Sequence, residues 1–237
     1  MDGWLIPPPV TPRKSKDEFA RERVDKVNWL IGRGLLKSER IKQALLKVPR
    51  EDFLPSQYRD YAYEELPFPL PGVNATISCP HSYPLFYEPL GLDRGQRFLE
   101  VGLGSGYGTA VAREVVGSEG LVVAVEIDPE TYAYARDRLT RAGYSDVVLV
   151  NADGGAGFPE LAPYDRISVT AACLIVPPPL IEQLAVGGRL IVPVIEDGVQ
   201  NLIVFNKSAT AITREVICQV LYVGLQGAYG ASSIDDA

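Results

Sequence analysis

Long apolar runs, paired cysteines and histidines are all scarce in this 237-residue chain. No segment approaches the ~20 apolar residues that a bilayer-spanning helix needs, and the N-terminal stretch lacks the basic and long apolar regions of a secretory signal. The cysteines Cys79, Cys173 and Cys218 form no Cys-x-x-Cys pair, which excludes a disulfide framework and a zinc ribbon. His81 is the only histidine, so a Ser-His-Asp triad or a histidine-based metal site would have to use it. We therefore expect a cytoplasmic protein with free thiols, no membrane partner and no catalytic metal.

Excess positive charge is also missing. The formal net charge is −7, and it is unevenly spread. Residues 1–60 carry 13 Lys and Arg against 9 Asp and Glu, whereas residues 61–237 carry 10 against 21. An acidic main body argues against binding to nucleic acid, so no such partner is expected. The apolar fraction of 46% is ordinary for a globular protein.

The first 95 residues differ in character from the rest. Residues 1–15 are rich in proline and predict an extended arm. Apolar residues at helical spacing predict a helix over about 16–31 and a second one after Ser38 that Pro49 stops. Residues 49–80 carry many Pro and Tyr without a clear period, and so long an irregular stretch is often functional.

From residue 96 the pattern alternates between strands and helices. The pattern predicts strands at 97–101, 121–127, 147–150, 166–169 and 189–194, with helices at 107–116, 129–142 and 178–185 between them. Two further strands, at 202–205 and 212–223, have no helix between them and predict an antiparallel hairpin. The fold class is therefore a doubly wound α/β sheet of seven strands, with the last hairpin antiparallel and an N-terminal helical extension.

A glycine-rich loop follows the strand at 97–101. It reads Gly102-Leu103-Gly104-Ser105-Gly106-Tyr107-Gly108, and a helix follows it, so backbone N–H groups can approach a ligand closely. The dinucleotide fingerprint Gly-x-Gly-x-x-Gly/Ala fails in every register, because the sixth position is Tyr107, Thr109 or Val111. The loop therefore predicts a ligand other than a dinucleotide.

Acidic residues end the first three strands. Glu100 stands two residues before the first glycine, where a carboxylate suits the sulfonium and ammonium cations of S-adenosylmethionine and would oppose a pyrophosphate. Glu126, beside Ile127, can accept both ribose hydroxyls, although a helix-capping role is the alternative. Asp153-Gly154 can hold the adenine amino group, or can form an ordinary Asp-Gly turn. The three acids in this order favour S-adenosylmethionine as the cofactor.

Several segments resemble protein-L-isoaspartate (D-aspartate) O-methyltransferases, and the resemblance covers about residues 22–226. The most specific is Ala75-Thr76-Ile77-Ser78-Cys79-Pro80-His81, which is similar to the signature loop of the family. The other matching segments are residues 48–55, 61–69, 99–110, 162–172 and 184–190.

The resemblance implies a fold, a reaction and a site. The fold is a class I S-adenosylmethionine-dependent methyltransferase domain at 96–226, preceded at 16–95 by helices and a loop that covers the donor, with 1–15 and 227–237 as arm and tail. The reaction is transfer of a methyl group to the α-carboxylate of L-isoaspartyl residues in damaged proteins and peptides, which is a repair activity. Ser78 is the implied catalytic residue. The implied donor contacts are Ala75, Thr76, Ile77, Ser78, Tyr83, Glu100, Gly102, Gly104, Gly106, Glu126, Ile127, Asp153, Gly154 and Gln226.

One departure from the family leaves alternatives open. The family usually has Val-Pro-Leu where this chain has Val223-Gly224-Leu225, a segment that helps to form the peptide site. A relative that methylates a different carboxylate is one alternative, and a donor-binding module without catalysis is another. The intact Ser78, Glu100 and Glu126 argue against the second. The oligomeric state stays open.

Overall fold

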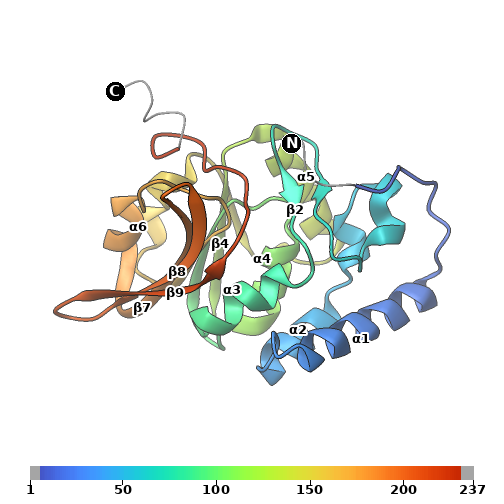
Figure 1. Cartoon of the computed structure of the whole chain (residues 1–237), viewed down its shortest axis with the longest axis horizontal. Helices are drawn as coiled ribbons and strands as arrows, with labels where there is room; N and C mark the ends of the chain where they lie inside the picture. Colours follow the sequence, from blue (N-terminus) through green and yellow to red (C-terminus); the bar gives the residue numbers. More distant parts are fainter. Residues whose placement is uncertain (1–5, 231–237) are drawn as a thin grey trace.

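The protein is a seven-stranded mixed sheet covered by helices on both faces (Figure 1). The computed structural model describes residues 6–230, so residues 1–5 of the expected arm and 231–237 of the expected tail lie outside it. The strand order is β5-β4-β3-β6-β7-β8-β9. Pairing is parallel from β5 to β7 and antiparallel for the last two pairs, which confirms the predicted fold. The strands are β3 (Arg97–Val101), β4 (Leu121–Glu126), β5 (Val148–Asn151), β6 (Tyr164–Val169), β7 (Leu184–Glu196), β8 (Val199–Lys207) and β9 (Ile212–Gln219).

The central strands are apolar because both of their faces are covered. On one face, α3 (Ser82–Leu90), α4 (Tyr107–Val116) and α5 (Pro129–Arg141) share one hydrophobic core with the N-terminal helices. On the other face, α6 (Pro178–Gln183) packs on a second core (Figure 1). The strand order reverses at β3, whose neighbours are β4 and β6. In such sheets ligands bind at the carboxyl ends of the strands beside this switch point.

Several boundaries differ from those that the sequence predicts, most of all the start of β7 and the end of β9. Helix α6 ends at Gln183, and β7 begins at Leu184 and runs through both Gly187 and Gly188. The pairing of β6 with β7 shifts register between Tyr164 and Arg166, so an irregular strand accommodates glycines that we expected to separate a helix from a strand. Strand β9 ends at Gln219, earlier than the predicted end at Val223. Residues 220–226 leave the sheet and line the cavity described below.

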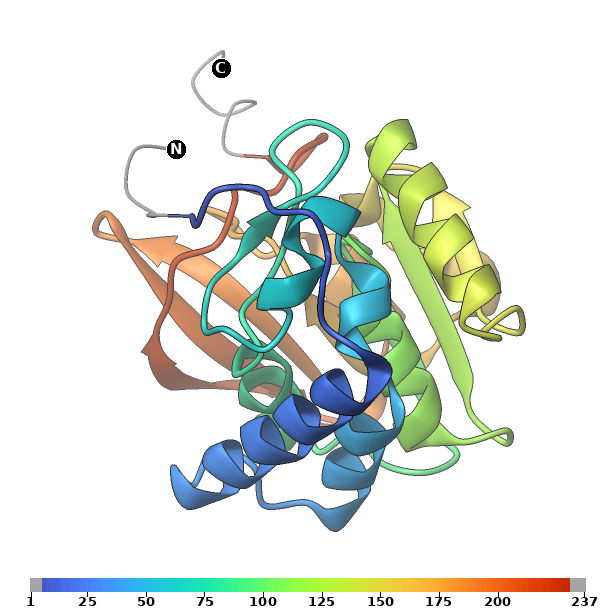
Figure 2. The ribbon, with the colours of Figure 1, turned by 90° about the vertical axis from the view of Figure 1, so that its right-hand side faces the viewer.

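The N-terminal extension is helical, as predicted. Helix α1 (Lys16–Gly32) has a complete capping box from Ser15, and α2 (Glu39–Lys47) is capped by Ser38. Helix α2 packs between α1 and α4, which ties the extension to the sheet domain. Figure 2 shows α1 and α2 in blue, side by side.

The segment between α2 and α3 is compact rather than open. It forms the 3₁₀ helices η1 (Arg50–Phe53) and η2 (Ser56–Tyr61) and a short hairpin of β1 (Phe68–Pro69) and β2 (Thr76–Ile77). Its many aromatic residues pack on one another, with Tyr58 and Tyr61 both against the buried Phe68. The described part of the arm lies against this segment, where the Val10 N–H donates to the Gln57 carbonyl oxygen at 3.0 Å. Within residues 6–230, no helix combines the length and the apolar character that crossing a bilayer requires.

Candidate active site

A cavity of about 810 Å³ lies at the carboxyl ends of β3 and β4. Its walls are the loop around β2, the glycine-rich loop, the end of β4 and the chain that follows β9. Four segments far apart in the sequence therefore meet at the switch point of the sheet. The predicted site residues that line it are Ala75, Thr76, Ile77, Ser78, Tyr83, Glu100, Gly102, Gly104, Glu126, Ile127, Gly154 and Gln226.

Gly106 is not among the lining residues. It precedes α4 with a φ of 82°, a conformation that glycine adopts without strain. A Cβ at this position would lie 2.9 Å from Cγ of Leu139 in α5. Gly106 therefore allows the loop to pack against α5, while Gly102 and Gly104 face the cavity.

Glu100 is a buried carboxylate at the end of β3, with 3% of its surface exposed. It accepts a hydrogen bond of 2.5 Å from the Thr109 hydroxyl and a long one of 3.5 Å from the Tyr87 hydroxyl. Burial raises the pKa of Glu100 to about 7, and the bond from Thr109 acts against that rise. A cation in the cavity would favour the ionised form, so this residue suits a positively charged ligand.

Glu126 is held by backbone N–H groups on both of its oxygens. Its Oε2 accepts from the Gly104 N–H at 3.0 Å, and its Oε1 accepts from the Asp128 N–H at 3.2 Å. Burial raises the pKa of Glu126, and the bond from Gly104 is the largest effect in the other direction. Each carboxylate oxygen has a further lone pair. Glu126 therefore faces the cavity as a fixed double acceptor, which is the geometry that a ribose diol requires.

Asp153 lies after β5, but it is not among the lining residues of the cavity. Its Oδ1 accepts from the Gly155 N–H at 2.9 Å, which is the turn that the sequence left open as an alternative. Its Oδ2 accepts from the Ala228 N–H at 2.8 Å. In this structure Asp153 fixes the chain that follows Gln226, and Gly154 reaches the cavity wall.

Arg50 supports the loop that carries Ser78, a role that the sequence reasoning missed. Its side chain is 1% exposed, and it donates to the Ser78 carbonyl oxygen at 2.7 Å and to the Ala62 carbonyl oxygen at 2.6 Å. The guanidinium also lies over the rings of Tyr83 and Tyr107. Residues 48–55 carry three consecutive charged residues, Arg50, Glu51 and Asp52, so nothing in the sequence alone singles out Arg50 for this role.

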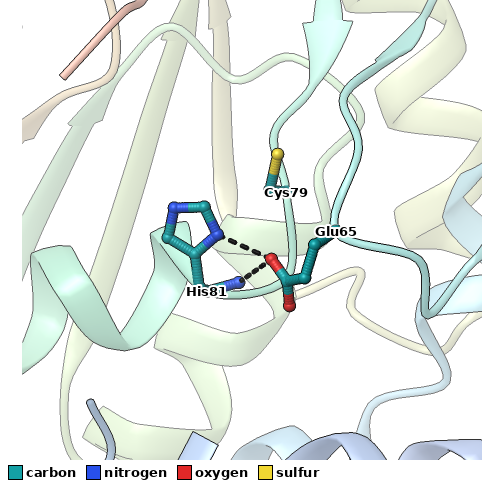
Figure 3. Close-up of side chains that lie close together, drawn as sticks. All are labelled: Glu65, Cys79 and His81. Carbon is teal, nitrogen blue, oxygen red and sulfur yellow. Dashed lines mark hydrogen bonds and ion pairs between the residues drawn. The ribbon is translucent and has the colours of Figure 1, made fainter. Parts of the chain in front are cut away.

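Glu65, Cys79 and His81 form a polar cluster at the edge of the cavity (Figure 3). Among residues 6–230 these three side chains are the group that could hold a metal ion, since their potential ligand atoms all lie within 4.8 Å of one another. His81 Nδ1 and Glu65 Oε2 are 2.6 Å apart, and Lys26 Nζ lies 3.0 Å from Glu65 Oε1. Figure 3 shows the Cys79 thiol directed away from that pair. Both oxygens of the Glu65 carboxylate therefore already have partners, His81 and Lys26, and the cluster is a hydrogen-bonded network.

The chain after β9 closes the remaining side of the cavity. The Leu225 N–H donates to the Ala172 carbonyl oxygen at 2.7 Å, and the Ala172 N–H donates to the Val223 carbonyl oxygen at 2.8 Å. Gly224 lies between these bonds, and a Cβ there would meet nothing within 4 Å. The departure from the family's usual proline therefore leaves the local backbone pairing intact.

Comparison with known proteins identifies the family. Residues 22–230 match the family described as protein-L-isoaspartate(D-aspartate) O-methyltransferase. The chain belongs to this family. The protein-L-isoaspartate O-methyltransferase of Korarchaeum cryptofilum is 43% identical over 216 residues, which are 87% of this chain and 97% of that protein. The protein of the same name from Hyperthermus butylicus is 42% identical over 231 residues, which are 93% and 95% of the two chains.

Solved structures agree with this assignment. One protein-L-isoaspartate O-methyltransferase superposes with a TM-score of 0.81 at 35% identity, over 88% of this chain and 67% of the other. A Plasmodium falciparum structure in complex with S-adenosyl-L-homocysteine has a TM-score of 0.77 at 23% identity, over 85% and 97% of the two chains, which shows a common fold. The predicted family is confirmed, and with it an enzyme that carries out S-adenosylmethionine-dependent methyl transfer to proteins that contain isoaspartyl residues.

Proposed function

We propose that this protein binds S-adenosylmethionine across Glu100, the glycine-rich loop and Glu126, and methylates the α-carboxylate of L-isoaspartyl residues beside Ser78. The observation that carries the proposal is the pair of buried carboxylates at the ends of β3 and β4. Both face the same cavity, and the loop with Ser78 forms part of its wall. Glu100 would pair with the cationic part of the donor, and Glu126 with its ribose. The remaining predicted contacts are Ala75, Thr76, Ile77, Tyr83, Gly102, Gly104, Ile127, Gly154 and Gln226.

The chemistry needs little more than alignment. A carboxylate oxygen of the acceptor attacks the methyl carbon, the carbon–sulfur bond breaks, and its electron pair stays on sulfur as the cation becomes a neutral thioether. Because a carboxylate is already ionised at pH 7, no strong general base is required. The enzyme holds oxygen, methyl and sulfur in line and excludes water while two opposite charges neutralise. The Ser78 hydroxyl would hydrogen-bond to the incoming carboxylate and orient it.

The methyl ester explains how transfer leads to repair. The esterified α-carboxyl group of an isoaspartyl residue has a good leaving group that the free acid lacks. The following backbone nitrogen then attacks that carbonyl, methanol leaves, and the succinimide that forms hydrolyses partly to normal aspartate. The acceptor is a peptide segment of a damaged protein. We expect no nucleic acid among the partners, because residues 61–237 are acidic.

A transfer assay with matched peptides tests the proposal. Peptides that differ only in an L-isoaspartyl or an aspartyl residue are compared, with S-adenosylhomocysteine affinity measured in parallel by calorimetry. We expect transfer to the isoaspartyl peptide alone, and Ser78→Ala should lower kcat while changing the S-adenosylhomocysteine Kd less than about threefold. Equal rates on both peptides would contradict the specificity. Intact donor binding without transfer to either peptide would favour another carboxylate acceptor or a binding module.

A further inference from the structure

The negative charge of the cavity disfavours a carboxylate acceptor, and the neutral Ser78 hydroxyl does not offset that charge. Its described lining includes two carboxylates, Glu100 and Glu126, but neither Lys nor Arg. The acceptor is itself a carboxylate and must enter beside them. His81 is the one basic side chain among the described residues that line the cavity.

His81 is oriented by a single carboxylate. Its ring Nδ1 lies 2.6 Å from Glu65 Oε2, and its backbone N–H donates to the same oxygen at 3.4 Å. Burial acts to raise the pKa of Glu65, but the bonds from His81 and Lys26 lower it overall, so this carboxylate is ionised at neutral pH. An ionised carboxylate only accepts hydrogen bonds, and Nδ1 must therefore carry a proton.

The second ring nitrogen is thereby left for another partner. Figure 3 shows Nε2 on the edge of the ring opposite Glu65, and no hydrogen bond joins Nε2 to another residue within 6–230. The ring is about two-fifths exposed, so Nε2 can meet a ligand. Ser78 precedes His81 by three residues, and both line the cavity. Arg50 donates a hydrogen bond of 2.7 Å to the Ser78 carbonyl oxygen and so holds this loop in place. Helix α3 begins at Ser82, so its positive end adds to the potential at this place.

We propose that His81, in its protonated form, binds the acceptor α-carboxylate through Nε2–H, with Glu65 as the positioning residue that orients the ring. The inference rests on the proposed function, since it names the group that receives that substrate. Lys26 pairs with the other oxygen of Glu65 and keeps the carboxylate in place. A salt link to the carboxylate is strongest before transfer, because the acceptor charge disappears as the ester forms. Such a contact lowers KM for the peptide and does not raise kcat.

Steady-state kinetics on full-length variants tests this assignment. His81→Leu should raise KM for an L-isoaspartyl peptide at least tenfold, with kcat within about threefold and the S-adenosylhomocysteine Kd within about twofold of wild type. His81→Lys should recover part of the lost affinity, because it restores a cation at the same wall. Glu65→Gln should raise KM less than His81→Leu, since it removes the orientation but keeps the ring. Cys218→Ser is the matched control, because Cys218 lines the same cavity outside the cluster.

The outcomes separate this inference from the proposed function. Absence of transfer by the wild-type enzyme to the isoaspartyl peptide would overturn both. Normal wild-type transfer with an unchanged KM in His81→Leu would overturn the role of His81 and leave the function in place. If His81→Leu raised KM for the peptide but also weakened donor binding and lowered the melting temperature, the role of His81 would be structural, and the inference would be overturned. A rise confined to KM, with recovery in His81→Lys, supports it.

Discussion

Arg50 donates a hydrogen bond of 2.7 Å from Nη2 to the carbonyl oxygen of Ser78, across 28 residues of sequence. The same guanidinium donates to the Ala62 carbonyl oxygen, so one buried cation joins η1, the end of η2 and the loop that forms the cavity wall. The position of Ser78 is thus set from outside the cavity, since Arg50 is not among the lining residues.

Replacing Arg50 should therefore damage catalysis through the loop. Arg50→Met leaves two carbonyl oxygens without their donors, each costing about 1–3 kcal/mol. Arg50→Lys should retain one of the bonds but cannot reproduce the fork of donors. We expect kcat on an isoaspartyl peptide to fall further for Met than for Lys, with a matching order of melting temperatures. Arg59→Lys, on a partly exposed ion pair with Asp52, is the control and should behave like wild type. Equal kcat in all three variants would contradict this account.

Glu100 predicts a dependence of stability on pH. The pKa of this carboxyl is raised to about 7 from an ordinary 4.5 by burial, so the folded state prefers the protonated form. The resulting stabilisation is complete below pH 4.5 and is lost as the pH rises through 7, by up to about 3 kcal/mol. Relative to Glu100→Gln, the donor-free wild type should therefore lose stability between pH 5 and pH 8.5 in urea unfolding. Parallel stability curves for the two proteins would contradict the prediction.

The same titration should appear in donor binding with the opposite sign. A cationic donor binds the ionised form of Glu100, so the affinity of the wild type for S-adenosylmethionine should increase from pH 6 to pH 8. Glu100→Gln should bind S-adenosylmethionine more weakly, and its affinity should depend less on pH. Calorimetric titration at three pH values measures both effects, and an equally steep increase in the variant would assign it to another group.

Glu126→Ala should weaken donor binding while the fold persists. The carboxylate presents one remaining acceptor position on each oxygen, and each bond to a ribose hydroxyl is worth about 1.5–3 kcal/mol. Calorimetric titration with S-adenosylhomocysteine measures the loss, and Glu126→Gln separates charge from size. An unchanged Kd in Glu126→Ala, in a protein with a native circular dichroism spectrum, would exclude the diol contact.

Asp153 offers a direct choice between two roles. If it holds the adenine amino group, Asp153→Asn should weaken S-adenosylhomocysteine more than the inosine analogue, which lacks that group. Its contacts with the Gly155 and Ala228 N–H groups predict the other result, an equal and small loss for both ligands. Calorimetric titration of the variant with the two ligands decides between the roles, and we expect the equal loss.

The three cysteines should be dispensable for turnover. All are free, as predicted, and burial raises the pKa of Cys79 and of Cys173 to about 11, which keeps these thiols protonated and poorly nucleophilic at neutral pH. Cys79→Ser, Cys173→Ala and Cys218→Ser combined should retain methyl transfer. A loss of more than about a hundredfold, or ~2.7 kcal/mol in the barrier, would reveal a chemical role.

The sheet, its order of elements and the acid–glycine loop were predictable because they follow local rules. Buried parallel strands are short apolar runs, and helix ends carry capping residues such as Ser38 and Asp128. Glu100 precedes the glycine-rich turn near the end of β3 and Glu126 ends β4, and the carboxyl ends of neighbouring parallel strands lie at one edge of the sheet. The division of the chain at residues 15, 95 and 226 stays a prediction.

Tertiary packing decided the roles that depend on partners distant in sequence. An acidic side chain after a strand can face a ligand or another loop. In this structure the Ala228 N–H donates a hydrogen bond to the second oxygen of Asp153. Gly106 faces α5 because Leu139 packs there. The bond between Arg50 and Ser78 and the pairing of Glu65 with His81 leave no periodic trace in the sequence. Periodicity reports which face of an element is buried, whereas a single buried polar side chain is defined by the one partner that satisfies it.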